Sequence, residues 1–286
     1  MKLSFINRER SGAVRGDAAF TMVEIALCLA IVGFALVAII GVLPAGLNVQ
    51  KENREETIVN QDSTVWLDAI RSGALGYNEL TQYVDRIVVT NWTYEFNATT
   101  TNRLDALTRT IVGEHGTAPN VLPPGVDTLL TSGDRVIGLL STPRLVPLDA
   151  NHFASNYVIA YCRAISGTAS EKPSQANADV RELAFAYRMV VDVTPVGSID
   201  PEGIATGPVD RIRRDNLAEV RLLLRWPLKE AFRPGVGTVA FPTDRPSAGN
   251  SKLVFRTQIA GSISAYALDP AAPGIPFYLI NSREFK

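Results

Sequence analysis

Cysteine, histidine and net charge are all scarce in this sequence. It has two cysteines, Cys28 and Cys162, and two histidines, His115 and His152. Two cysteines rule out a disulfide framework, and we expect these two not to pair, because only Cys28 lies in a long apolar run. Both histidines fall in expected loops without nearby metal-ligand residues, so no zinc site is predicted. A formal net charge of −1 provides no basic surplus, so no nucleic-acid partner is expected.

Recognisable catalytic and cofactor-binding motifs are missing as well. Residues 235–237 read Gly-Val-Gly, which lacks the third glycine and the strand-to-helix setting of a phosphate-binding loop. No serine stands in a nucleophile-elbow pattern, and no dense acidic run near the C-terminus could hold calcium. We therefore expect no enzyme, no cofactor and no metal site.

A long hydrophobic run does occur, over residues 25–47, and it is long enough to cross a bilayer as a helix. The residues before it include Lys2, Arg8, Arg10 and Arg15, which favours a cytoplasmic N-terminus. They contain no apolar core of their own, so the run after them would stay with the mature protein. These features predict a single-pass protein of the inner (cytoplasmic) membrane, with its N-terminus cytoplasmic and its C-terminal domain periplasmic or otherwise extracytoplasmic.

One carboxylate, Glu24, stands at the start of this otherwise uncharged run. A charge at that place is costly in lipid and suggests a functional site, although a signal anchor with an accidental interfacial Glu is the alternative. Small residues on one helical face would allow close helix packing, or they are simply the common small residues of membrane helices: Ala26, Ala30, Gly33 and Gly41. Pro44 is expected to kink or locally melt the helix near its outer end.

Residues 20–24 read Phe-Thr-Met-Val-Glu, between a basic leader and the apolar run. This order resembles the type IV pilins and the pseudopilins of type II secretion, which share a prepilin-type cleavage and methylation motif. That family normally has glycine where this chain has Ala19; cleavage after Gly16 is an alternative that would leave Asp17 first. Residues 20–30, with Arg-Glu-Glu-Thr at 54–57, also resemble the pilin-like Verru_Chthon cassette proteins.

The resemblance implies a processing and assembly route. A prepilin peptidase would cut between Ala19 and Phe20 and methylate the new amino terminus of Phe20. Glu24 would pair with the N-terminal amine of a neighbouring subunit, because a buried carboxylate needs a positive partner. The implied partners are the peptidase, other pilin-like subunits, an inner-membrane assembly platform and the lipid bilayer. The product would be a structural subunit of a pilus-like filament for secretion or envelope transport.

Two other functions remain open at this point. In the first, the chain is a single-span membrane anchor whose outer domain binds a partner without joining a filament. In the second, it is an enzyme tethered to the membrane. Leader processing separates the filament subunit from both.

Beyond the apolar run the helical pattern becomes amphipathic. Val59, Trp66 and Ile70 fall on one face, and an adjoining apolar face carries Ile58, Val65 and Ala69. The opposite face is polar: Asn60, Gln61, Thr64, Asp68 and Arg71. Gly73 is a suitable stop for this helix.

The remaining residues predict a strand-rich domain, in which alternating or β-branched runs mark the strands: 86–96, 135–141, 156–165, 183–193, 220–226 and 252–263. Residues 74–84 are expected as a short helix or turn, 113–133 and 194–216 as connections, and 269–286 as an irregular tail. The predicted fold is α+β, with a long N-terminal helix, membrane-spanning in its first half, packed on an antiparallel sheet. The expected domains are a leader (1–19), a transmembrane segment (20–47), an amphipathic continuation (48–73) and a β-rich globular domain (74–286).

Overall fold

The computed structural model describes residues 21–73, 78–97, 100–113, 128–130, 132–148, 151–166, 185–196, 207–228, 248–266, 276–283 and 285. The chain divides into two compact units, of residues 1–53 and 54–286, and their boundary falls within helix α1 (Met22–Ser72). Each unit is described by itself.

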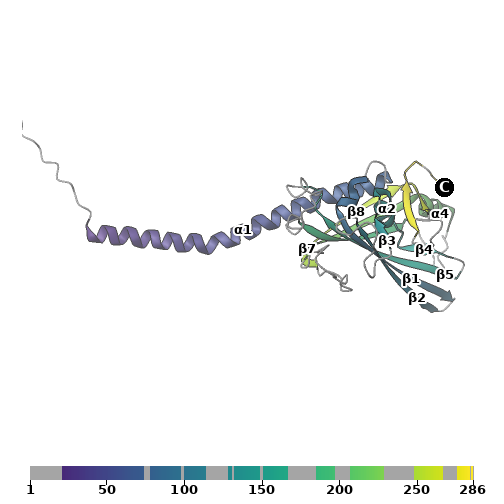
Figure 1. The fold of residues 1–286 in the computed structure, drawn as a ribbon, viewed down its shortest axis with the longest axis horizontal. Coiled ribbons are helices and arrows are strands. Elements are labelled where there is room, and N and C mark those ends of the chain that lie inside the picture. Colours follow the sequence, from purple (N-terminus) through teal and green to yellow (C-terminus); the bar gives the residue numbers. More distant parts are fainter. Residues whose placement is uncertain are drawn as a thin grey trace, which may run out of the picture. The chain divides into compact units, whose positions relative to one another are not determined.

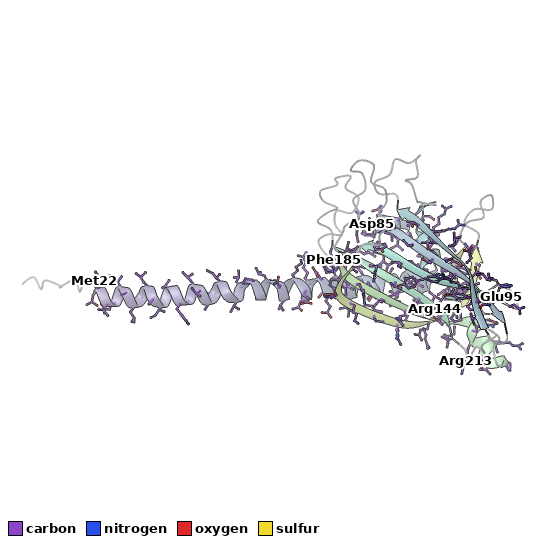
Figure 2. All side chains as sticks on the ribbon, turned by 90° about the horizontal axis from the view of Figure 1, so that it is seen from below. Met22, Asp85, Glu95, Arg144, Phe185 and Arg213 are labelled. Atoms are coloured by element: carbon purple, nitrogen blue, oxygen red, sulfur yellow. The ribbon has the colours of Figure 1, made fainter. Side chains whose placement is uncertain are left out.

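In the first unit, α1 carries apolar side chains that are exposed around the helix, as Figure 2 shows near Met22. This stretch is long and apolar enough to cross a membrane. A helix pairs its backbone groups internally, as a lipid environment requires, except that Pro44 has no N–H to donate. The helix is continuous through Pro44, so the local melting we considered there is absent. Cys28 is exposed on this helix and Cys162 is buried elsewhere, and both are free, as expected.

The second unit is built on an eight-stranded sheet (Figure 1). Seven strands run in the order β3-β2-β1-β5-β6-β7-β8, and β4 pairs with β5. All described pairs are antiparallel except β2 with β3. The strands are β1 (Val84–Asn97), β2 (Thr100–Gly113), β3 (Thr128–Leu130), β4 (Leu145–Pro147), β5 (His152–Arg163), β6 (Ala186–Pro195), β7 (Leu217–Leu228) and β8 (Ala248–Ala260). The α+β prediction, with a long N-terminal helix and a largely antiparallel sheet, is confirmed.

The second half of α1 packs on one face of this sheet, which we call the inner face. Val59, Trp66, Ala69 and Ile70 are fully buried there against apolar side chains of β1, β5, β6, β7 and β8. Burying a valine or isoleucine side chain stabilises the fold by about 1.5–3 kcal/mol relative to leaving it exposed. The predicted apolar and polar faces are therefore confirmed, as is the end of the helix at Gly73, whose φ of 63° favours glycine.

One predicted strand is wrong. Residues 135–141 belong to helix α2 (Gly133–Leu140) and the residue after it, and most of the helix is buried. A short apolar run that is buried on more than one side shows neither the two-residue period of a strand nor the 3.6-residue period of a helix. Hydrophobic periodicity alone therefore does not distinguish a strand from a helix here. Gly138 allows α2 to approach the C-terminal strand β10 (Phe277–Asn281) closely, because a Cβ there would lie 2.4 Å from Cδ2 of Phe277.

The C-terminal region also differs from the sequence-based expectation. The tail expected to be irregular contains β10, which pairs with β9 (Ser262–Tyr266) as a separate two-stranded sheet. The strand expected over 252–263 breaks at Gly261, whose φ is 142°. The connection expected over 194–216 contains helix α4 (Pro208–Asn216), and the 3₁₀ helix η1 (Asn78–Gln82) agrees with the helix or turn expected over 74–84.

Candidate functional site

The predicted assembly residue Glu24 lies in the first turn of α1, one turn after Thr21. Its Oε2 accepts hydrogen bonds from the backbone N–H of Thr21 (2.8 Å) and from the Thr21 hydroxyl (2.9 Å). The Thr21 hydroxyl in turn accepts from the Glu24 backbone N–H at 3.3 Å. Ala19 and Phe20, the predicted processing residues, lie outside the described residues.

Thr21 and Glu24 thus form a capping box, in which an N-cap threonine and the residue at N3 satisfy each other's backbone N–H groups. The Thr-x-x-Glu spacing of residues 21–24 is the sequence signature of such a box and is the signal that predicts it. Glu24 Oε1 has no hydrogen-bond partner among the described residues, so one carboxylate oxygen remains available to an outside donor.

A second polar site, also missed from sequence, is a buried network around Asp62, which is 0% exposed. Its Oδ2 accepts from the Ile165 backbone N–H (2.9 Å) and the Tyr187 hydroxyl (2.9 Å). Its Oδ1 accepts from the Ser166 backbone N–H (2.8 Å) and hydroxyl (2.5 Å). Trp66 Nε1 donates to the Tyr187 hydroxyl at 2.8 Å, so one carboxylate connects α1 with the end of β5 and with β6.

Burial sets the protonation of this network. It raises the pKa of Asp62 above 3.8, and the hydrogen bonds that the carboxylate accepts only partly oppose this. Burial likewise raises the pKa of Tyr187 well above 10.0, assisted by the nearby Asp62 charge, so the hydroxyl stays protonated and can donate.

This pKa gives the stability of the second unit a specific pH dependence. Because the folded state binds the Asp62 proton more tightly than the unfolded state, this group's contribution to stability is largest below pH 3.8 and falls as pH rises through the raised pKa. We expect the difference in unfolding free energy between the protein and its Asp62→Asn variant to grow on acidification. Urea titrations over a pH series measure it. A constant difference would show that the hydrogen bonds cancel the effect of burial, and a shrinking one that they outweigh it.

The outer face of the sheet, opposite to the helix, is divided into rows of cross-strand neighbours. One row is cationic apart from a tyrosine: Arg86, Tyr161, Arg188, Arg225 and Lys252. The next row is apolar: Val88, Ile159, Val190, Leu223 and Val254. Beyond it Asp192, Arg221 and Arg256 face one another across β6, β7 and β8. In the first row, the Arg86 guanidinium stacks over the Tyr161 ring at 4.4 Å.

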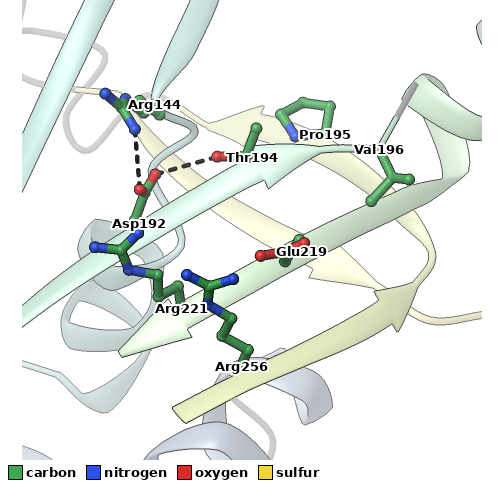
Figure 3. A pocket seen from close by; sticks show the side chains of 8 residues that line it. All are labelled: Arg144, Asp192, Thr194, Pro195, Val196, Glu219, Arg221 and Arg256. Carbon is green, nitrogen blue, oxygen red and sulfur yellow. Dashed lines mark hydrogen bonds and ion pairs between the residues drawn. The ribbon is translucent and has the colours of Figure 1, made fainter. Parts of the chain in front are cut away.

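A pocket of about 310 Å³ opens at the last of these rows (Figure 3), lined by Arg144, Asp192, Thr194, Pro195, Val196, Glu219, Arg221 and Arg256. Asp192 is already engaged there, with Arg144 at 3.2 Å and with the Thr194 hydroxyl at 3.1 Å. Arg221 and Arg256 lie side by side, and within the described residues neither guanidinium makes a hydrogen bond or ion pair. Two adjacent like charges repel each other, and the pocket lining holds three arginines against the two carboxylates of Asp192 and Glu219, so this end of the pocket favours an anion.

Among the residues that the structure describes, no three His, Cys, Asp or Glu side chains are grouped closely enough to hold a metal ion. His115 lies outside the described residues. His152 was expected in a loop, but it is the half-buried first residue of β5. The strand begins before the residues of high β propensity from which it was predicted, so its first residues were assigned to a loop.

No protein-family profile matches this sequence, and neither a curated protein nor a solved structure shows significant similarity to it. The long helix and sheet are compatible with a pilin-like architecture. The function must therefore be inferred from the residues of this chain.

Proposed function

We propose that this chain is a pilin-like structural subunit that a prepilin peptidase cuts between Ala19 and Phe20 and methylates at Phe20. It then assembles through the first half of α1 into a pilus-like filament, with the bilayer and an inner-membrane assembly platform as its earlier partners. The observation that supports this is the placement of Glu24. It stands at the head of a helix with exposed apolar side chains, and one of its carboxylate oxygens has no partner in the described chain.

The remaining chain fits a structural role. The apolar stretch of α1 offers a surface that either lipid or neighbouring helices can cover. The second half of α1 is held on the sheet by its apolar face, which includes Trp66, and by the hydrogen bonds that the buried Asp62 accepts. No catalytic step is part of the proposal.

The capping box favours a second candidate, a membrane-anchored binding module that does not assemble. It accounts for Thr21 and Glu24 within one chain, with no neighbouring subunit.

Leader processing is the direct test. We expect protein purified from membranes of a host that has a prepilin peptidase to begin at N-methylated Phe20, measured by intact mass and N-terminal sequencing. The matched control is Ala19→Gly, which restores the residue usual in the family and should be cut at the same bond. A mature protein that begins at Asp17 would move the cut to Gly16, and a retained leader would refute processing and favour the anchored module.

A further inference from the structure

Strand β8 forms one edge of the large sheet, and no described strand pairs with its free side. It is thirteen residues long, and from Ser251 to Ala260 it pairs without a break with β7 on the other side. A long edge strand presents unpaired backbone N–H and C=O groups at which another extended chain can add.

The outer-face side chains of β8 determine which chain fits. Lys252 and Arg256 are exposed, and Val254 between them is 46% exposed. Together β7 and β8 carry four basic side chains and one acidic one. A second copy of β8 pairing antiparallel about Val254 would bring Lys252 against Arg256, and like charges directly opposite each other are destabilising. The edge therefore disfavours itself and favours a chain of opposite charge.

We propose that the β8 edge docks an acidic segment of a partner polypeptide as an added strand. The complementary pattern is acidic, any, apolar, any, acidic, which brings carboxylates opposite Lys252 and Arg256 and an apolar side chain beside Val254. Because the charges of β8 are symmetric about Val254, the pattern fits in either strand direction. The inference goes beyond the filament role and depends on neither the leader nor Glu24.

The pocket strengthens the contact at one end of the segment. Arg256 lies beside Arg221 there (Figure 3), and Asp192 is already engaged with Arg144. A carboxylate that faces Arg256 therefore enters a site with two adjacent guanidinium groups, which suits a charge-assisted hydrogen bond.

The test uses the full chain in non-ionic detergent and a fluorescent seven-residue peptide in which glutamate, valine and glutamate alternate with threonine. Binding is measured by anisotropy. We expect saturable binding that Arg256→Glu weakens by about tenfold or more, because a reversed charge both removes an attraction and adds a repulsion. The matched control is Arg103→Glu, the same charge change at an exposed residue of β2, which should leave the dissociation constant unchanged.

Two further peptides separate strand addition from simple charge attraction. N-methylation of alternate backbone amides should abolish binding, because it removes the ladder hydrogen bonds on one side. A peptide with one glutamate changed to lysine should bind Arg256→Glu better than it binds the unaltered protein. Absent binding, equal losses in Arg256→Glu and Arg103→Glu, or full binding of the N-methylated peptide would each overturn the proposal.

Discussion

Replacing Asp62 with alanine should lower the free energy of unfolding of the second unit by about 2 kcal/mol or more, since each donor left without an acceptor away from water costs about 1–3 kcal/mol. Asp62 accepts four hydrogen bonds, and two of them come from the backbone N–H groups of Ile165 and Ser166, which cannot turn toward other acceptors. The variant also removes the acceptor of the Tyr187 hydroxyl, to which Trp66 donates. Urea unfolding followed by tryptophan fluorescence measures the change.

Asp68→Ala is the matched control on the same helix. Asp68 is 55% exposed, and its contact with Arg71 is 3.5 Å long between exposed side chains. Exposed pairs of this kind contribute about 0–1 kcal/mol, so the control should change stability little. If Asp62→Ala destabilised the protein no more than Asp68→Ala does, the buried network would not be what holds α1 on the sheet.

The fold was predictable where one face of an element is buried and the other is not. The alternation in β6, β7 and β8 and the apolar stripe of the second half of α1 each have a clear period, and both are confirmed. At α2 the pattern predicted a strand wrongly, because this helix is buried on several sides and has no such contrast. No strand was expected at β2, where residues 101–108, including Leu104 and Leu107, are all exposed and the buried Ile111 lies near the end of the strand.

The candidate site was predictable only in part, for a different reason. Glu24 is conspicuous because it is a lone charge before an apolar run, whereas Asp62 is one polar residue among many in an amphipathic helix. The partners of Asp62 are more than a hundred residues away along the chain, so only the tertiary fold shows that it is buried and fully bonded. The outer-face rows likewise depend on strand register, which alternation alone does not provide.

Glu24→Ala should leave membrane insertion intact and reduce incorporation into filaments by about two to four orders of magnitude, because removing one partner of a buried charge pair costs about 3–5 kcal/mol. Insertion should persist because the apolar stretch of α1 is unchanged and the variant removes a charge rather than adding one. Membrane fractionation measures insertion, and the amount of subunit in sheared filaments measures assembly. This expectation rests on the proposed filament role.

Glu24→Gln distinguishes the two physical roles of this carboxylate. Glutamine retains the capping box, since its side-chain oxygen can still accept from the Thr21 backbone N–H, but it cannot pair ionically with an amine. If Glu24 acts by charge, the Gln variant should fail in assembly as severely as the Ala variant. If it acts by capping, the Gln variant should assemble normally while Glu24→Ala frays the first turn of α1, a cost of about 0.5–2 kcal/mol for a lost cap. Normal assembly of both variants would remove Glu24 from the mechanism and leave the anchored module as the better account of this chain.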